Sequence, residues 1–203
     1  MTRTFLLSPA YAGGRRAQML LSDRAQFELA RRLRSGDSVS LGEAFTFLSG
    51  LYFRGKLAYA NAFALPDPSH VLVITPTRGL VPAATPITLA DLREFAEVDI
   101  EDGDPRYRKP LERDLRTLVR RLTPQCQIIL LGSVATGKYV NILLEILRER
   151  IEFPAEFVGR GDMSRGGLLL RCAVDRQELA YIPVEGAIRK GKRPPKLAPR
   201  RYT

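Results

Sequence analysis

The sequence contains few of the residues that hold metals or form disulfides: it has two cysteines and one histidine in 203 residues. Cys126 and Cys172 each lie among aliphatic residues in a segment that we expect to be a strand. We therefore favour buried free thiols, which suit a reducing cytoplasm, over a disulfide. With His70 as the single histidine and no Cys-x-x-Cys pair, no zinc site of the usual kind is expected. We predict neither a metal nor a cofactor.

Long apolar segments are also missing from the sequence. No apolar run approaches the roughly 18 residues that a membrane-spanning helix needs. The first residues contain only the short apolar segment Phe5–Leu7, which is not typical of a signal peptide. We therefore expect a cytoplasmic protein without a membrane partner. A hydrophobic content of 45% and a charged content of 27% are typical of a globular domain.

Acidic residues are absent from the last fifteen residues, RKGKRPPKLAPRRYT. Because this segment carries seven of the +10 formal net charges, only +3 is left for residues 1–188. We therefore expect one α/β domain over residues 1–188 and a basic tail over 189–203, where three prolines argue against a helix. The tail could attract the phosphates of DNA or RNA, or it could serve only solubility. Its candidate nucleic-acid-binding residues are Arg189, Lys190, Lys192, Arg193, Lys196, Arg200 and Arg201.

Strand and helix patterns alternate along the domain. Continuous apolar runs predict buried strands over residues 4–8, 70–77 and 125–133. Helical periodicity predicts helices over residues 25–36, 40–63 with a break near Gly50, 88–98, 106–123 and 139–150. This alternation favours an α/β three-layer sandwich with a mostly parallel central sheet.

Three further segments complete the expected fold. Residues 77–88 are expected to form an irregular loop, and residues 153–167 a short strand that continues as a loop. Residues 168–174 and 178–184 predict a C-terminal β-hairpin. In the aromatic segment 49–60, apolar residues at helical spacing are expected in the core, with Arg54 and Lys56 at its rim; stacking of its rings on bases is the alternative.

The segment ILLGSVATGKYV, from Ile129 to Val140, has the spacing of a Walker A phosphate loop in Gly132, Gly137 and Lys138. Tyr139, however, stands where a Ser or Thr should bind Mg²⁺, and no clear Walker B aspartate follows. A nucleoside triphosphatase is therefore the less favoured alternative. A tight strand-to-helix turn capped by Ser133 or Thr136 and a helix N-terminus that binds an anion both stay open.

Basic residues occur in each of four loops that follow expected strands, over residues 9–16, 75–80, 132–138 and 158–167. If the strands are parallel, these loops meet at one edge of the sheet and form a phosphate-binding surface. The alternative is that each glycine only shapes its own turn. The candidate phosphate-binding residues are Arg15, Arg16, Arg78, Gly132, Ser133, Thr136, Gly137, Lys138, Arg160, Ser164 and Arg165.

Asp162 is the one acidic residue of the loop 158–167, where it stands between Arg160 and Arg165. Neighbouring arginines keep a carboxylate ionised, so that it can act as a general base or orient a water molecule. Asp162 is therefore the candidate catalytic residue, with a charge-paired turn as the alternative.

Three segments together carry a resemblance to a known fold: FLLSPA (5–10), VLVITPTRGLVPAATPI (71–87) and ILLGSVATGKYVNILL (129–144). Their layout is similar to that of uncharacterised bacterial proteins of the uracil-DNA-glycosylase-like α/β fold, and to the corresponding domain of archaeosine synthase. The sequence departs from the glycosylases because the loop 9–16 has no acid for water activation. Pro68, Ser69 and His70 also differ in order and place from the later His-Pro-Ser type motif. No catalytic residue is therefore carried over.

These observations predict a nucleic-acid- or nucleotide-related protein with a basic phosphate-binding edge. The resemblance implies an enzyme acting on N-glycosidic bonds, whereas the basic tail alone would suit a non-catalytic module that binds nucleic acid. The sequence does not choose between DNA and RNA, or between enzyme and binding module.

Overall fold

A six-stranded sheet forms the centre of the molecule in the computed structural model, which describes residues 2–199. The strand order is β4-β3-β1-β6-β7-β8. The four inner strands are mutually parallel: β3 (Val71–Thr75), β1 (Arg3–Leu7), β6 (Gln127–Leu131) and β7 (Ile151–Pro154). The edge strands β4 (Gly79–Pro82) and β8 (Tyr181–Pro183) are antiparallel to their neighbours. The predicted mostly parallel α/β sheet is confirmed.

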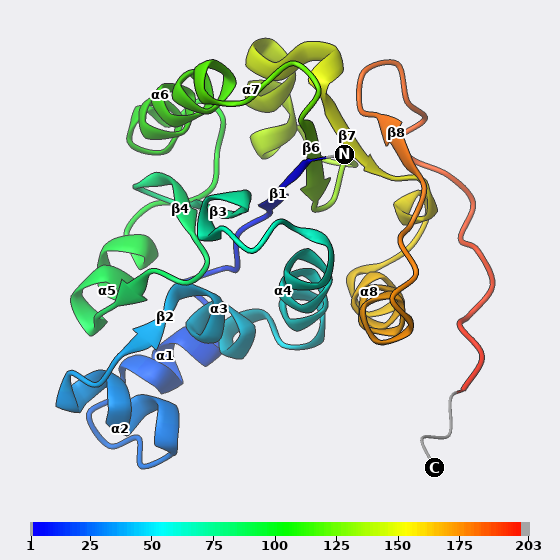
Figure 1. The fold of residues 1–203 in the computed structure, drawn as a ribbon. Helices are drawn as coiled ribbons and strands as arrows, with labels where there is room; N and C mark the ends of the chain where they lie inside the picture. The colour runs from blue at the N-terminus through cyan, green and yellow to red at the C-terminus, as the bar shows by residue number, and fades with distance from the viewer. Residues whose placement is uncertain (1, 200–203) are drawn as a thin grey trace.

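Helices cover both faces of this sheet, with α6 and α7 on one side and α4 and α8 on the other (Figure 1). A small antiparallel sheet of β2 (Val39–Ser40) and β5 (Pro86–Ile87) lies near the first helices. The helices are α1 (Arg15–Leu21), α2 (Glu28–Ser35), α3 (Leu41–Ser49), α4 (Leu51–Phe63), α5 (Leu89–Ala96), α6 (Pro105–Arg121), α7 (Gly137–Leu147) and α8 (Asp162–Asp175). Short 3-10 turns lie at Pro68–His70, Arg148–Arg150 and Ala155–Phe157.

Local sequence signals explain where several helices begin and end. The Thr88 hydroxyl accepts a hydrogen bond from the Asp91 amide, and the Asp91 carboxylate accepts one from the Thr88 amide, so α5 begins with a capping box. Asp104 caps α6 with Pro105 in its first turn. Gly50, at a φ of +66°, separates α3 from α4, so the predicted break is confirmed.

The predicted C-terminal β-hairpin is wrong in its first arm. Residues 168–174 lie inside α8, and only the second arm forms a strand, β8, which pairs with β7. A short apolar run does not distinguish a buried strand from a buried helix, and two glycines made the preceding residues resemble a loop. The segment expected to be irregular, residues 77–88, likewise contains β4 and β5.

Gly166 of α8 allows close packing against α4. A Cβ on Gly55 of α4 would lie 2.5 Å from the carbonyl oxygen of Gly166 in α8. A Cβ on Gly166 would lie 2.7 Å from the carbonyl oxygen of Leu51 and 2.8 Å from the Cα of Tyr52. The two backbones therefore touch where neither helix carries a side chain.

Both cysteines are buried, as predicted, although Cys126 lies just before β6 and Cys172 lies in α8. Across residues 2–199, no helix has the length and apolar character to cross a membrane. The same residues contain no group of three or more His, Cys, Asp or Glu side chains placed to hold a metal.

Substituting Gly166 should weaken the fold. In Gly166→Ala the added methyl group meets rigid backbone atoms of α4, so we expect the free energy of unfolding to fall by about 1–3 kcal/mol. Gly103→Ala is the matched control, because a Cβ there has open space around it, and its effect should stay within about 0.5 kcal/mol. Urea unfolding measures both. Equal midpoints for Gly166→Ala and the natural protein would contradict the close contact.

Candidate functional site

The sheet changes its direction of growth between β1 and β6. The chain places β3 on one side of β1 and then returns to add β6 on the other side. At such a switch point the two following loops part and leave a crevice at the carboxyl ends of the strands. Ser8 follows β1 directly and Gly132 follows β6, and the Ser8 amide donates to the Leu131 carbonyl at 3.1 Å.

A pocket of about 400 Å³ occupies this crevice, and we call it the switch-point pocket. Its polar lining includes Ser8, Lys56, Ser133, Lys138, Tyr139 and Asp162. A larger hollow of about 520 Å³ lies near Thr2, His70 and Cys126. Those residues precede strands, so that hollow lies at the amino end of the sheet, where α/β folds seldom carry a site.

Lys56 is the most unusual residue of the pocket. Its side chain on α4 is 1% exposed, although the sequence predicted it at the rim of the core. The Nζ atom donates to the Ser8 carbonyl oxygen at 2.6 Å and to Ser8 Oγ at 2.9 Å. It also lies 4.7 Å from the ring centroid of Tyr52 and 4.6 Å from that of Phe53. Burial lowers the pKa of Lys56 to about 7, while the Asp162 carboxylate acts in the opposite direction.

Tyr139 on α7 also lines the pocket next to Ser8. Its hydroxyl donates to the Ser133 carbonyl oxygen at 2.7 Å. Burial raises the pKa of Tyr139 to about 12, and hydrogen bonding with the Ser8 side chain is the largest effect in the opposite direction. A Cβ on Gly132 would lie 2.8 Å from Ser8 Cβ and 3.0 Å from Tyr139 Oη, so this position requires glycine. The Walker-like Gly132 thus makes room for a hydroxyl cluster, and the Tyr139 hydroxyl is engaged within the protein.

Two helices begin at the pocket without a side-chain cap. Thr136 precedes α7 and Gly161 precedes α8, and neither makes a side-chain capping hydrogen bond. The first backbone N–H groups of both helices therefore lack a capping side-chain acceptor. Next to these ends, Lys138 and Asp162 line the pocket.

Asp162 is held by a buried arginine. Arg165 Nη1 donates to Asp162 Oδ1 at 3.2 Å, one turn along α8. The Arg165 side chain is buried and also donates to the Phe157 carbonyl oxygen through Nε at 3.2 Å and Nη2 at 3.0 Å. The two hydrogen bonds to the Phe157 carbonyl hold the Arg165 guanidinium in place. Arg165 therefore orients the carboxylate of Asp162, whose side chain is 66% exposed.

The described part of the basic tail, residues 189–199, contacts α8 and the segment that precedes it. A Cβ on Gly159 would lie 2.3 Å from the Lys192 carbonyl oxygen, and one on Gly167 would lie 3.6 Å from Leu197 Cδ1. Two hollows between the tail and α8 share Arg160 and Arg193, and we call them together the tail groove. Among the described residues, no acid lines it. Its basic residues are Arg160, Arg165, Arg171, Arg189, Lys190, Arg193 and Lys196.

The remaining candidate residues have varied surroundings. Ser164 accepts a hydrogen bond from Arg160 Nη1 at 3.2 Å, beside the tail groove. Gly137 begins α7, where a Cβ would lie 2.5 Å from the Asn141 side chain. Lys192 is exposed. Arg200 and Arg201 lie outside the described residues.

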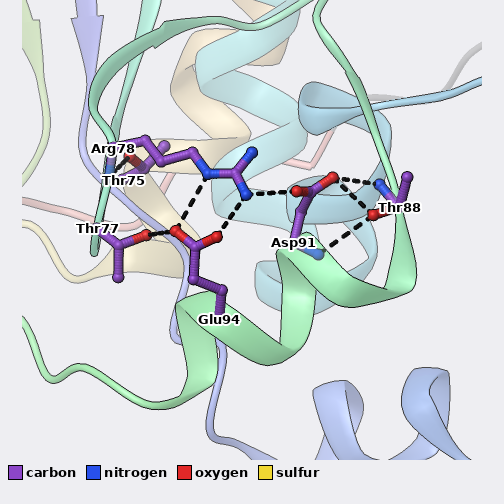
Figure 2. Close-up of polar contacts among 6 residues, drawn as sticks. All are labelled: Thr75, Thr77, Arg78, Thr88, Asp91 and Glu94. Atoms are coloured by element: carbon purple, nitrogen blue, oxygen red, sulfur yellow. Dashed lines mark hydrogen bonds and ion pairs between the residues drawn. The ribbon is translucent and has the colours of Figure 1, made fainter.

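Arg78 lies at the carboxyl end of β3 but serves a local network (Figure 2). Its guanidinium forms ion pairs with Asp91 and Glu94 of α5, the pair with Asp91 at 2.5 Å. Hydrogen bonding from Arg78 lowers the pKa of Glu94. Two carboxylates thus balance one guanidinium, which leaves little free positive charge for a phosphate. Arg78 is not among the residues that line the switch-point pocket.

The arginines of the first loop are likewise outside the pocket lining. Arg15 and Arg16 begin α1 and are exposed, and Arg16 Nη1 donates to the Phe47 carbonyl oxygen at 3.3 Å. Tyr11 from the same loop does line the pocket. Of the four basic loops, the first, third and fourth therefore reach the pocket, and the first reaches it without its arginines.

Sequence reasoning missed Ser8, Lys56 and Tyr139 as site residues. Ser8 carried the only usable signal, because a polar residue directly after a buried strand lies at the carboxyl edge of the sheet. Lys56 had none, since its aromatic neighbours Tyr52 and Phe53 indicate burial of the helix but not of the amine.

Comparison with family models, with curated proteins and with solved structures finds no match for this chain. The resemblance to the uracil-DNA-glycosylase-like fold therefore stays a prediction. The chemistry of the site has to be inferred from the pocket and the groove themselves.

Removal of the Lys56 amine should abolish a pH dependence of stability that the natural protein has. The lysine pKa is 10.5 in the unfolded chain and about 7 in the folded protein. Between these values only the unfolded chain holds the proton, so the natural protein gains stability as pH rises. Relative to the natural protein, Lys56→Met should therefore lose about 2 kcal/mol between about pH 6 and about pH 9.

Urea unfolding at the two pH values measures this difference. Lys109→Met, at an exposed position of α6, is the matched control and should show no such trend. A stability difference for Lys56→Met that stays constant with pH would contradict the lowered pKa.

Proposed function

We propose that the protein binds a nucleotide or a nucleic-acid strand, with phosphates in the tail groove and the attached sugar or base in the switch-point pocket. One observation carries this proposal. The Asp162 carboxylate of the pocket is hydrogen-bonded to Arg165, which lines the groove. The catalytic candidate and the basic surface therefore adjoin at the beginning of α8.

The charge of the groove supports a polyanionic ligand. Basic residues from α8, from the segment before it and from the tail gather there, and no acid of the described chain lines it. Positive charges that are spread along a groove suit a chain of phosphates, because their binding releases the counterions of the nucleic acid. The contact of the tail backbone with Gly159 places this part of the tail beside the groove.

The pocket offers groups for the part of the ligand that carries no phosphate. Tyr11 lies at the pocket with 66% of its surface exposed, so its ring is free to stack on a base. Asp162 is solvent-accessible, and its carboxylate is oriented by the hydrogen bond from Arg165. It can accept a proton from a water molecule that attacks the anomeric carbon of a nucleoside, with departure of the base. This is the chemistry of N-glycosidic-bond hydrolysis.

A non-catalytic binding module is the second candidate. It is favoured by the packing of the tail, because the basic groove on α8 is complete without any contribution from Ser8, Lys56 or Tyr139. The two candidates share the groove and differ only in whether Asp162 performs chemistry.

Binding to single-stranded oligonucleotides should depend on the groove. In Arg193→Glu/Lys196→Glu we expect at least about 10-fold weaker binding at low salt and a shallower dependence of log Kd on log salt concentration. Fluorescence anisotropy with labelled DNA and RNA measures both quantities. Lys109→Glu/Arg120→Glu on α6 is the matched control, because it changes the net charge equally on the other side of the sheet.

Two results would contradict the binding proposal. One is natural protein that shows no salt-dependent binding to DNA or to RNA. The other is an equal loss of affinity in both double variants, which would assign the attraction to net charge instead of the groove.

Release of free base from a bound oligonucleotide should require Asp162. We expect Asp162→Asn to slow release at least about 100-fold while Kd changes less than about 2-fold, because the amide cannot accept the proton of water. Chromatography of the released base measures the rate. Asp99→Asn changes another carboxylate at the pocket and should leave the rate unchanged.

The same experiment separates the two candidates. If the natural protein binds an oligonucleotide but releases no base, the catalytic proposal fails and the binding module remains. If both Asn variants lose release equally, Asp162 is not the specific base.

A further inference from the structure

Ser8 and Lys56 form a hydroxyl–amine pair that the proposed function does not use. Lys56 Nζ lies 2.9 Å from Ser8 Oγ, which is within the range for direct proton transfer. Both residues line the switch-point pocket. The pair is thus placed where a bound molecule can meet it.

We propose that Ser8 is a nucleophile whose proton is taken by Lys56, and that the switch-point pocket catalyses acyl transfer from a carboxylic ester. The proposal goes beyond nucleic-acid binding and does not depend on it. Ser–Lys pairs are a recognised variant of the nucleophile–base arrangement, in which an unprotonated amine replaces histidine as the base.

The surroundings of the Lys56 amine suit a base better than a structural cation. Its two hydrogen-bond partners are neutral atoms of Ser8, and within the described chain no carboxylate oxygen lies at ion-pair distance from it. A buried lysine usually has a charged partner. An uncharged amine fits these contacts: one N–H donates to the Ser8 carbonyl oxygen at 2.6 Å, and the lone pair can accept the Ser8 hydroxyl proton.

The pair is held rigidly from several sides. The rings of Tyr52 and Phe53 enclose the amine, and the Tyr139 hydroxyl lies next to Ser8 in the space that Gly132 leaves free. Such packing fixes the Nζ–Oγ geometry before any ligand binds. The titratable and charged groups that face the pair are Tyr52 on α4, Lys138 and Tyr139 on α7, Asp162 and Arg165 on α8, and Asp99 after α5.

The reaction would proceed in two halves. Ser8 Oγ forms a bond to the carbonyl carbon while its proton passes to Lys56 Nζ. The tetrahedral intermediate then expels the alcohol, which takes that proton. Water then attacks the acyl carbon and gives a proton to Lys56 Nζ. The bond between Ser8 Oγ and the acyl carbon breaks, Ser8 Oγ takes the proton back from Lys56, and the carboxylic acid leaves. Lys138, in the first turn of α7, lines the same pocket and carries a positive charge that can stabilise the developing negative oxygen.

A neutral ester fits this position better than a phosphate ester. Asp162 lies at the same pocket, so a phosphate bound beside it would meet like charge. Pro9, Ala10 and Ile100 add apolar surface to the lining, which suits an acyl chain. Phosphates of the same ligand would instead lie in the tail groove.

The test uses the purified full-length protein and a fluorophosphonate probe, which forms a Ser–O–P bond with loss of fluoride. Intact mass and peptide mapping locate the label. We expect label on Ser8 in the natural protein, none at position 8 in Ser8→Ala, and labelling at least about 100-fold slower in Lys56→Met. Ser38→Ala, at an exposed serine that does not line the pocket, should be labelled like the natural protein.

The pH dependence of the unmodified chain gives a readout that does not rest on a variant. Because Lys56 has to be unprotonated, the labelling rate should rise about 10-fold per pH unit below about pH 7 and level off above it. Hydrolysis of p-nitrophenyl acetate should follow the same profile.

Three results would overturn the proposal: no label on Ser8 at about pH 8, equal rates in folded Lys56→Met and the natural protein, or a rate that is flat across pH. None of them bears on oligonucleotide binding. Conversely, the tail-groove variant Arg193→Glu/Lys196→Glu should lose nucleic-acid binding but keep the labelling of Ser8. The two proposals can therefore fail separately.

Discussion

The contact between α4 and α8 is the constraint on which the candidate site depends. Gly55 and Gly166 allow the two backbones to touch, with a Cβ on either residue excluded by atoms of the other helix. Lys56 follows Gly55 directly, and Asp162 lies one turn before Gly166. A larger separation of the helices would move the amine and the carboxylate apart and open the pocket between them.

Burial of a protonated Lys56 in this arrangement is energetically unfavourable. An unpaired ammonium group loses its hydration in the core, and only the hydroxyl and carbonyl of Ser8 and two aromatic rings compensate. This loss of hydration lowers the pKa of the Lys56 amine to about 7. Retention of a titratable amine at the switch point, where an apolar side chain of similar length would fit, is the pattern expected of a functional group.

The charged residues after β3 and those near α8 have different surroundings. Arg78 after β3 is balanced by Asp91 and Glu94, so this end is internally neutralised (Figure 2). Near α8, the tail adds basic residues to a groove that no acid of the described residues lines. Basic side chains of the described residues therefore gather beside Asp162 without the acidic partners that Arg78 has.

The sequence by itself determined the mostly parallel α/β sheet, the break at Gly50 and the burial of both cysteines, because each follows from local periodicity or residue chemistry. It also predicted Ser133, Lys138 and Asp162 near one edge of the sheet, and all three line the switch-point pocket, although Lys138 lies in α7 and Asp162 in α8 instead of in loops. Only the tertiary structure decided that residues 168–174 form a helix, because their conformation depends on the glycine contact with α4. Only it joined Ser8 to Lys56, 48 residues apart. Such a contact depends on how α4 packs across the sheet, and no local pattern encodes that distance.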